Sequence, residues 1–446
     1  MPSQIYQFGF APKPDWSRIW ASGSEIAQYH RDVVDRFGLA PLIRLNTEVT
    51  EASWDDRRAE WTVTTAAGDA FSADFLICAT GVLHHPFVPD IPGLGEFGGT
   101  VVHTARWDDD VDTAGARIAV IGTGSTGVQV VSALQPGAAT LDHYARSAQW
   151  MLWAPMSLPQ LPGMAPVLKR FPAVHNSVFD MFQWASAILA DITTRPSWRR
   201  RAVQAYARLS LRAQVRDSAL RDKLTPDYQP LCKRQVVSGT YYRAIQAPNA
   251  DLVTEAVTEV TPTGIRTADG THRETDIIVL ATGFQAHNYM RPMTVLGRDG
   301  ISIDDAWAKS PRAYRMTAIP GFPNLFTVLG PNSPTGSISL QFTSELTAGW
   351  IAQWLKRFRD GSLNTVEVTE EATTAFNDDV QAAMGPTVWN TGCNSWYFTE
   401  DNTIDLWPWD RAMLVAMLKS PEEKHFRLSY EGRPWTTAKS QHCALR

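Results

Sequence analysis

Short apolar runs and stretches of helical periodicity alternate along this chain. The run at 117–121 is β-rich and leads, through a glycine-rich turn, into a segment with helical spacing that extends to Leu134. The runs at 74–81 and 276–283 are apolar for most of their length, and each ends in Ala-Thr-Gly. Strands that are buried on both faces have this composition, so the pattern predicts an α/β fold with buried strands.

One arrangement of three elements occurs twice, about 200 residues apart. Each copy is a strand, then a hairpin, then a buried strand that ends in Ala-Thr-Gly. The first copy comprises residues 43–52, 61–71 (with the turn at 66–69) and 74–81, and the second comprises residues 251–260, 264–272 and 276–283. Such a duplication predicts two related nucleotide-binding domains. A further strand at 323–332 is predicted to rejoin the first of them.

Four segments have the spacing of amphipathic helices. They are residues 24–37, with Ser24 as N-cap and Gly38 as the stop, residues 176–192, residues 198–220 and residues 344–358. The second and third belong to a helical insertion at about 150–231, between the two copies. Its basic residues, which include Arg199, Arg200 and Arg201, are interpreted as a solvated helix face. A substrate lid and a membrane-surface patch are the alternatives.

The turn after the strand at 117–121 has the spacing Gly-x-Gly-x-x-Gly. Its residues are Gly122, Thr123, Gly124, Ser125, Thr126 and Gly127. Between a strand and a helix, the first glycine permits the turn, the second lets a pyrophosphate approach the backbone, and the third lets helix and strand pack closely. The helix N-terminus then offers free N–H groups to the phosphates. We therefore predict a dinucleotide site at this turn.

The next strand, at 140–146, indicates which dinucleotide binds. Its end carries Arg146 and Ser147. A carboxylate at this position would accept a hydrogen bond from the ribose 2′-hydroxyl of NAD, whereas an arginine suits the 2′-phosphate of NADP. Asp142 is the competing residue by sequence distance, but it lies early in the strand. The pattern favours NADPH.

Composition narrows the class of protein further. The 446 residues suffice for two or three domains, and a formal net charge of −5 leaves no basic footprint for nucleic acid. No apolar run reaches membrane-spanning length, so membrane association is not expected, and the N-terminus does not resemble a secretory signal. Four cysteines, Cys78, Cys232, Cys393 and Cys443, lack metal-ligand spacing. They predict reduced thiols, a cytoplasmic setting and no structural metal.

The linker between the first Ala-Thr-Gly and the glycine-rich turn carries the pattern F-x-G-x-x-x-H-x-x-x-W-D. Its residues are Phe97, Gly99, His103, Trp107 and Asp108. This pattern resembles the fingerprint of the type I Baeyer–Villiger monooxygenases, and the glycine-rich turn follows it at the place expected in that family. The segments 2–6, 15–18 and 25–29 also resemble the family's flavin-proximal region. The resemblance extends over essentially the whole chain.

The resemblance implies two cofactors, FAD and NADPH, on separate dinucleotide domains. NADPH reduces the flavin, the flavin activates O2, and one oxygen atom is inserted beside the carbonyl of a small-molecule ketone to give an ester or lactone. An arginine of the NADPH domain is expected to stabilise the negative charge that develops on oxygen. Arg234 matches that site, because a planar, permanently charged donor suits the task better than the neighbouring Lys233.

The resemblance also assigns residues to the cofactors. His103 and Trp107 would tie the linker to domain movement and NADP placement, and Lys233 would bind NADPH. The flavin side of FAD would be bound by Trp16, Arg18, Ala79, Thr80, Gly81 and Asn332. The family carries a FAD-binding Gly-x-Gly-x-x-Gly about one βαβ unit ahead of the first copy. This sequence has no second such motif, so we expect that unit to belong upstream of Met1 and to be missing from the chain.

The predicted architecture is therefore α/β, with two Rossmann-like dinucleotide-binding domains, the first lacking its N-terminal βαβ unit, and a helical insertion. Residues 1–108 are assigned to the remainder of the FAD domain and the linker, residues 109–290 to the NADPH domain, and residues 291–446 to the return to the FAD domain and the substrate-lining segments. Two other functions stay open. One is N- or S-oxygenation, against which the fingerprint argues, and the other is a non-catalytic remnant that only binds NADPH.

Overall fold

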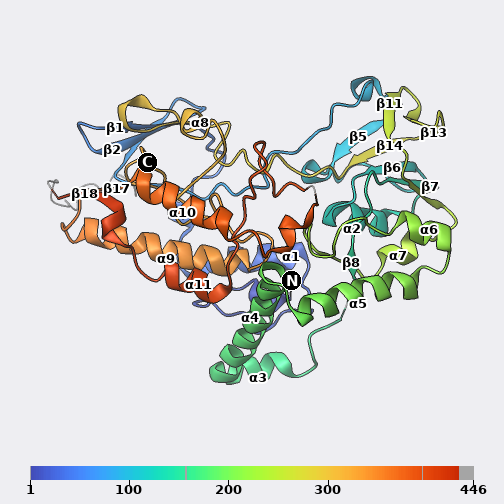
Figure 1. Cartoon of the computed structure of the whole chain (residues 1–446), viewed down its shortest axis with the longest axis horizontal. Coiled ribbons are helices and arrows are strands. Elements are labelled where there is room, and N and C mark those ends of the chain that lie inside the picture. The colour runs from blue at the N-terminus through green and yellow to red at the C-terminus, as the bar shows by residue number, and fades with distance from the viewer. Residues whose placement is uncertain (1, 156–157, 394, 431–446) are drawn as a thin grey trace.

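The structure is a computed structural model that describes residues 2–155, 158–393 and 395–430. Figure 1 shows two groups of strands toward opposite ends of the molecule. We call the group around β6 (Arg117–Ile121) and β14 (Ile277–Leu280) the nucleotide lobe, and the group around β1 (Val49–Asp55) and β17 (Thr365–Val368) the second lobe. Helices lie between and below the two groups in this view.

The nucleotide lobe is built on a parallel five-stranded sheet with the order β10-β7-β6-β14-β5. Besides β6 and β14, its strands are β5 (Thr100–His103), β7 (Thr140–Tyr144) and β10 (Ala250–Val253). All four residues of β14 are buried, and α2 (Ser125–Leu134) packs Val128 and Val131 into the same core. The predicted α/β fold is confirmed, because this central strand is paired on both sides and covered as its composition requires.

The second lobe contains smaller sheets in the described part of the chain. One has the order β15-β1-β2-β3, with β2 (Glu60–Thr65), β3 (Ala70–Ala73) and β15 (Thr294–Leu296). In the others, β4 (Leu76–Cys78) pairs in parallel with β16 (Leu325–Thr327), and β17 pairs with β18 (Phe426–Ser429). Because β16 pairs with β4, the chain returns to the first copy of the repeat, as the sequence predicted.

The internal duplication is visible in the topology. β1, β2 and β3 form an antiparallel unit that precedes β4, and β11 (Val257–Thr261), β12 (Gly264–Thr267) and β13 (His272–Glu274) form a second unit that precedes β14. Both predicted hairpins are confirmed. The strand predicted at 251–260 is wrong as a single element, because it divides into β10 and β11, which pair in different sheets.

Two further strand predictions need correction. The first strand begins at Val49 rather than at residue 43, since Ile43 and Leu45 lie exposed outside the sheet. The strand at 74–81 is not fully buried: in β4, Cys78 is buried, but Ile77 is 42% exposed. The reason is its pairing, because β4 has β16 as its one partner in the described structure, whereas β14 lies between β6 and β5.

The helices follow the predicted spacing but not every predicted boundary. α1 (Gly23–Arg36) is capped by Ser22, whose hydroxyl accepts a hydrogen bond from the Glu25 N–H, so the prediction of Ser24 as N-cap is wrong by two residues. The insertion contains α3 (Met164–Arg170), α4 (Pro172–Thr194), α5 (Trp198–Gln214) and α6 (Ser218–Lys223). α5 ends before residue 220 because Asp217 is extended and caps α6.

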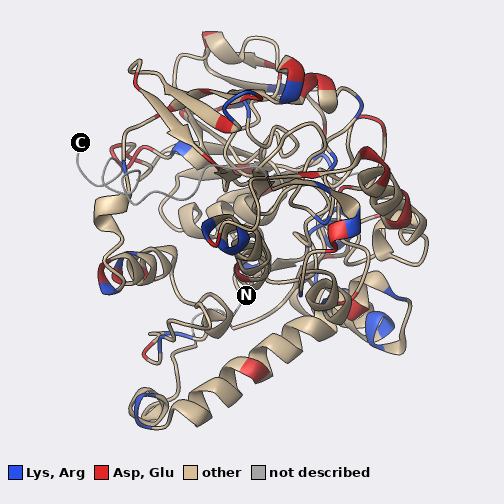
Figure 2. Cartoon of the chain, turned by 90° about the vertical axis from the view of Figure 1, so that its left-hand side faces the viewer, with Lys and Arg blue, Asp and Glu red and all other residues tan. Residues whose placement is uncertain are grey.

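The remaining elements are short, apart from two helices of the second lobe. They are α7 (Tyr241–Ala244), α8 (Ile303–Ala306), α9 (Leu340–Arg359), α10 (Glu370–Ala382), α11 (Arg411–Met417), β8 (Met151–Leu152) and β9 (Val236–Val237). The core beneath α9 and α10 buries Trp350, Trp354 and Trp407 completely. In Figure 2, which faces the second lobe, basic and acidic residues are interspersed over the surface.

The prediction that all cysteines are reduced thiols is wrong for one pair. Cys232 and Cys393 form a disulfide, with their Cα atoms 6.1 Å apart. They lie 161 residues apart in the sequence, so their spacing gave no sign of the pairing. Cys78 is a free thiol whose pKa is raised to about 12 by burial. Cys443 lies outside the described residues.

Candidate functional site

The glycine-rich turn is closed so tightly that two of its positions admit only glycine. Gly122 has a φ of 120°, and a Cβ atom on it would lie 2.3 Å from the Ala281 carbonyl oxygen. A Cβ atom on Gly127 would lie 2.0 Å from the carbonyl oxygen of Gly122. No side chain caps the first turn of α2, whose N-cap is Gly124. Its N–H groups therefore remain available to an anion such as a phosphate.

A buried histidine supports the glycine-rich turn through a hydrogen bond to its backbone. The His143 Nε2 atom lies 2.9 Å from the Gly122 carbonyl oxygen, and its Nδ1 atom lies 2.8 Å from the Tyr241 hydroxyl. A neutral ring that donates from Nε2 and accepts at Nδ1 satisfies both contacts. Burial lowers the pKa of His143 to about 4, so the neutral form is the one present near neutral pH.

Cations gather beside the turn. The Lys233 ammonium lies 3.4 Å from the Ser147 hydroxyl and 4.5 Å from the centroid of the Tyr228 ring. Burial lowers the pKa of Lys233, and the nearby positive charge of Arg146 lowers it further. A half-buried Lys233 and an exposed Arg146 close to each other favour the binding of an anion between them. The structure therefore brings Arg146, Ser147 and Lys233, which the sequence predicted to bind the nucleotide, close together.

Asp142, the competing acidic residue, is engaged elsewhere. Asp142 lies on strand β7, and its carboxylate is 3.7 Å from the Arg273 guanidinium. Burial raises its pKa, although Arg273 opposes that rise. The partner of Asp142 is thus a side chain of β13, not a group at the glycine-rich turn.

The fingerprint residues lie along the edge of the nucleotide sheet. A Cβ atom on Gly99 would lie 2.3 Å from the Asp276 carbonyl oxygen, so this glycine permits β5 to approach β14. In the parallel register, His103 stands opposite Leu280, one residue before the second Ala-Thr-Gly. Its Nδ1 atom accepts a hydrogen bond from the Ala105 N–H at 3.1 Å, and burial lowers its pKa. Trp107 is 37% exposed.

The segments that follow the two Ala-Thr-Gly sequences run side by side. The Phe87 N–H donates a hydrogen bond to the Gly283 carbonyl at 2.9 Å, and the Thr282 hydroxyl donates to the Phe87 carbonyl. Pro86 and Phe284 form an antiparallel bridge. These contacts join the two connections that carry the chain between the lobes.

The residues predicted to face the flavin fall into two groups. Ala79, Thr80 and Gly81 follow β4, and the turn with Asn332 follows β16, so both lie at the carboxyl end of one parallel pair. Ala79 and Thr80 are exposed. The Asn332 side chain is buried and donates to the Asn377 amide oxygen at 2.8 Å. The backbone of Asn332 is therefore the part of this residue that borders the carboxyl end of the β4–β16 pair.

Trp16 and Arg18 belong to a separate N-terminal segment. Trp16 is buried against Tyr29, whereas Arg18 is exposed. The Ile19 N–H donates to the Leu158 carbonyl at 3.1 Å, so this segment pairs with the start of the helical insertion. Within the described residues, this segment makes no hydrogen bond with residues 79–81.

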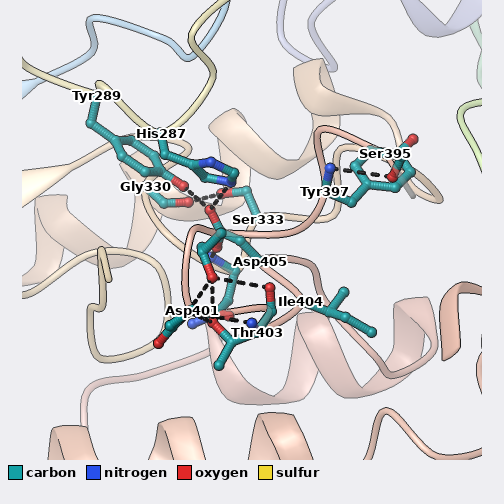
Figure 3. Close-up of polar contacts among 12 residues, drawn as sticks. His287, Tyr289, Gly330, Ser333, Ser395, Tyr397, Asp401, Thr403, Ile404 and Asp405 are labelled. Atoms are coloured by element: carbon teal, nitrogen blue, oxygen red, sulfur yellow. Dashed lines mark hydrogen bonds and ion pairs between the residues drawn. The ribbon is translucent and has the colours of Figure 1, made fainter. Parts of the chain in front are cut away.

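Sequence reasoning missed a buried carboxylate at the junction of three segments. Asp405 accepts a hydrogen bond from the Tyr289 hydroxyl at 2.5 Å (Figure 3). It accepts a second one from the Asn332 N–H, also at 2.5 Å. The His287 Nε2 atom lies 3.6 Å from the same carboxylate. Burial raises the pKa of Asp405, and the charge of His287 opposes that rise. Asp405 thus links the connection after the second Ala-Thr-Gly to the turn after β16.

Arg234 was predicted to be the catalytic residue, and it reaches across to the second lobe. Its guanidinium donates a hydrogen bond to the Thr335 carbonyl at 3.0 Å, and its side chain is otherwise exposed. The next residue, Gly336, has the Tyr397 hydroxyl 3.2 Å from its Cβ position. The Tyr397 hydroxyl is buried and has no hydrogen-bond partner among the described residues.

The disulfide holds these two segments together. Cys232 lies two residues before Arg234, and Cys393 lies four residues before Tyr397. The positive charge of Arg234 lowers the pKa of Tyr397 against a larger rise caused by burial. Neither the disulfide nor the nearness of Tyr397 to Arg234 left a signal in the sequence, because both depend on residues more than 150 positions apart.

The fold and these sites define the class of protein. Two lobes related by an internal repeat, one with a complete dinucleotide-binding turn, are typical of flavin-linked pyridine-nucleotide oxidoreductases. Residues 8–158 match the family described as pyridine nucleotide-disulphide oxidoreductase. No helix of the described residues is long and apolar enough to cross a membrane.

Similar proteins narrow the class to a family. A monooxygenase of Mycobacterium tuberculosis, described as uncharacterized, is 46% identical over 96% of this chain and 86% of its own length. A Baeyer–Villiger monooxygenase of Streptomyces coelicolor is 36% identical over 92% of this chain and 79% of its own length. A Baeyer–Villiger monooxygenase of Pseudomonas aeruginosa is 34% identical over 91% of this chain and 77% of its own length. The chain belongs to the Baeyer–Villiger monooxygenase family.

Solved structures agree with the sequence relatives. A cyclohexanone monooxygenase from Rhodococcus bound to NADP+ superposes with a TM-score of 0.85 and 27% identity, over 96% of this chain and 89% of that one. A steroid monooxygenase bound to NADP superposes with a TM-score of 0.82 and 28% identity, with the same coverage. The predicted family and the predicted α/β, two-nucleotide architecture are confirmed.

Proposed function

We propose that this chain is an FAD- and NADPH-dependent monooxygenase that inserts one oxygen atom of O2 beside the carbonyl of a ketone, to give an ester or a lactone. The observation that carries this proposal is the position of the Lys233-Arg234 pair. Lys233 contacts Ser147 of the nucleotide lobe, and Arg234 contacts Thr335 of the second lobe. One basic segment therefore borders both lobes, where a nucleotide and a reacting oxygen would meet.

NADPH fits the nucleotide lobe. Its pyrophosphate would lie on the turn at 122–127, where Gly122 and Gly127 have no room for a Cβ atom and the α2 N–H groups are uncapped. Its 2′-phosphate would lie between Arg146 and Lys233, whose mutual repulsion an anion relieves. His103 and Trp107 would couple the bound nucleotide to the linker, since His103 lies at the end of β5 beside the second Ala-Thr-Gly.

The flavin side of FAD fits the carboxyl end of the β4–β16 pair. Ala79 and Thr80 are exposed there, and no atom lies within 4 Å of a Cβ position on Gly81, so the backbone is accessible to a flat ring. The Asn332 backbone borders the same end, and Trp16 and Arg18 would complete the site from the N-terminal segment. The bound flavin would accept electrons from NADPH and activate O2.

Arg234 would bind the oxygen atom on which negative charge develops. Its guanidinium carries a permanent charge and five N–H donors, of which the Thr335 carbonyl takes one. A fixed cation stabilises a transition state most where charge appears and water is excluded. We assign the ester-forming chemistry to this position and not to His103, which is held as a neutral acceptor for the Ala105 N–H.

The first test is a visible spectrum of the purified chain, followed by product analysis with cyclohexanone. We expect flavin bands, NADPH consumption at 340 nm that depends on the ketone, and ε-caprolactone as the product. A thioether and a tertiary amine are the comparison substrates. Oxidation of only these two would replace ketone oxygenation by S- or N-oxygenation, and a colourless protein that still binds NADPH would indicate a nucleotide-binding function alone.

The second test is the substitution Arg234→Ala. We expect the rate of ester formation to fall by about 100- to 1,000-fold, which is the usual effect of losing one donor to a developing oxyanion. NADPH affinity should change far less, because Lys233 and Arg146 remain. Arg201→Ala, on the exposed face of α5, is the matched control and should keep both properties. Unchanged ester formation in Arg234→Ala would rule out the assigned role.

A further inference from the structure

The helical insertion differs in charge from the rest of the chain. Residues 150–231 contain eleven lysines and arginines but only five acidic residues, which gives this segment a net charge of +6 in a chain whose net charge is −5. A charge asymmetry of this size within one chain is typical of a surface that binds an anionic partner.

Six of the eleven cations are available to such a partner. Arg200 is buried and donates to the Ile192 and Thr193 carbonyls, so it serves the fold. Arg195 pairs with Asp410, and Arg208 lies over the Trp150 ring. Arg221 and Lys223 donate to the Val215 and Leu252 carbonyls. The exposed remainder is Lys169, Arg170, Arg199, Arg201, Arg212 and Arg216.

The same helices expose large apolar side chains. Their exposed fractions range from 43% to 68% for Leu161, Val167, Phe171, Val174, Met181, Trp184, Trp198, Tyr206 and Leu209. Two of the cations stand directly beside exposed aromatic rings: Arg170 lies 5.7 Å from the Phe171 ring, and Arg199 lies 5.7 Å from the Trp198 ring. We call these cations and apolar residues together the basic-apolar surface.

The basic-apolar surface lies at one side of the molecule. Figure 1 shows α3 and the adjoining end of α4 projecting below the body, with α5 running along the same lower side. α4 is 23 residues long, yet it buries few side chains, most of them near its carboxyl end. A long helix whose exposed face is largely uncharged and apolar leaves a surface that water does not favour.

We propose that the basic-apolar surface binds the surface of an anionic lipid bilayer. Exposed lysine and arginine side chains form ion pairs with the lipid phosphates, while Trp, Phe, Met and Leu side chains enter the boundary between head groups and acyl chains. A nucleic acid would use the cations but would leave Leu161, Met181 and Leu209 without an apolar partner. In this proposal the helices lie on the membrane, because no helix of the described residues is long and apolar enough to span one.

This proposal replaces the interpretation of the insertion as a solvated helix face. That interpretation rested on the basic residues of α5 alone. It did not include the exposure of Phe171, Met181 and Trp184, which only the packing of α3 and α4 decides. Peripheral binding is independent of the proposed reaction, so the test below needs no ketone and no turnover.

The test is the partition of the full chain onto lipid vesicles, measured by flotation. Vesicles of phosphatidylcholine with 30% phosphatidylglycerol are compared with vesicles of pure phosphatidylcholine, at low and high salt. We expect binding to the anionic vesicles that weakens with salt. The double variant K169Q/R170Q should bind about 30-fold more weakly, since each cation near such a surface contributes about fivefold.

A second double variant, M181S/W184S, tests the apolar part. It should weaken binding even at high salt, where the cations contribute little. R57Q/K309Q removes two exposed cations outside the insertion and is the matched control that should bind normally. All variants are checked for an unchanged melting temperature.

Several outcomes would overturn the proposal. They are no binding to anionic vesicles, equal loss of binding in R57Q/K309Q, and binding of a DNA duplex with the same dependence on both double variants. Self-association of the free chain that M181S/W184S abolishes, without vesicle binding, would identify the surface as an interface between two copies instead.

Discussion

Tyr289 and Tyr397 are both buried tyrosines, but only one of the two hydroxyls has a partner. Tyr289 donates to the Asp405 carboxylate, whereas the Tyr397 hydroxyl has no partner among the described residues. Burial raises the pKa of both, so each is a neutral phenol at neutral pH. Their replacement by phenylalanine should therefore have different consequences.

We expect Tyr289→Phe to lower the free energy of unfolding by about 1.5–3 kcal/mol, because a buried carboxylate loses a donor. Tyr397→Phe should leave it unchanged or raise it slightly, because a buried polar atom without a partner is removed. Urea unfolding of the two variants beside the unsubstituted protein measures the difference. Equal destabilisation by both would show that the Tyr397 hydroxyl has a partner in the folded protein.

The glycine-rich turn offers a second matched pair at this scale. A Cβ atom at Gly127 would meet the Gly122 carbonyl oxygen at 2.0 Å, whereas at Gly137 the nearest atom lies 3.9 Å away. Gly127→Ala should therefore lower the melting temperature and weaken NADPH binding at least tenfold, and Gly137→Ala should do neither. Calorimetry and fluorescence titration check both, and normal NADPH binding by Gly127→Ala would contradict the close packing.

At the scale of elements, the strand–turn–helix unit of β6 and α2 depends on a neutral His143. The pKa of His143 is lowered to about 4 in the folded protein, against an ordinary value of 6.5. As the pH falls from about 6.5 toward 4, His143 is therefore protonated in the unfolded chain but stays neutral in the folded one. The stabilisation is complete above pH 6.5 and is lost across this window.

This predicts an acid-sensitive nucleotide lobe. The free energy of unfolding should fall by up to about 1.4 kcal/mol per pH unit from this residue between pH 6.5 and 4. His143→Asn should reduce the slope of the free energy of unfolding against pH. The same change should lower stability at pH 7, because it removes an imidazole ring that fits the site. Denaturant unfolding at several pH values measures both slopes, and identical slopes would show that His143 titrates normally.

Element boundaries also show what a single sequence leaves open. The hairpins and β14 were predicted correctly, since alternation and continuous apolar runs report local burial. The strand at 251–260 was not, because whether a chain stays in one sheet depends on its neighbours. β10 pairs with β7, and β11 pairs with β12. The exposure of Ile77 in β4 has the same origin.

At the scale of the whole molecule, the Cys232–Cys393 disulfide joins the segment of Arg234 to a C-terminal loop. Two of the four cysteines form this bond, and Cys78 is a free thiol. Titration of the denatured protein, purified without reductant, should therefore find at least two fewer thiols than titration after reduction. Four thiols before reduction would contradict the disulfide.

The bond should also matter for stability. Cys393→Ser is expected to lower the free energy of unfolding by about 2–4 kcal/mol, the usual range for a cross-link that closes a long loop. Thermal unfolding with and without reductant measures the effect. Reductant should destabilise the unsubstituted protein but not the variant, and an equal response of both would assign the effect to another group.

The sequence alone determined the family, the α/β class, the repeat and the dinucleotide turn. Local patterns indicate these features: glycine spacing, apolar runs, and the fingerprint from Phe97 to Asp108. It also predicted a nucleotide-binding role for Arg146 and Ser147 from the end of a strand, and for Lys233 from the family resemblance, which carries long-range information that periodicity lacks.

Only the tertiary structure decided the rest. The disulfide, the buried carboxylate of Asp405, the place of Tyr397 near Arg234 and the exposure of α3 and α4 all depend on contacts between distant segments. The physical reason is that burial, pairing and charge environment are properties of neighbours in space. A residue's type limits what it can do, and packing then decides whether its surroundings are water, a partner or an apolar core.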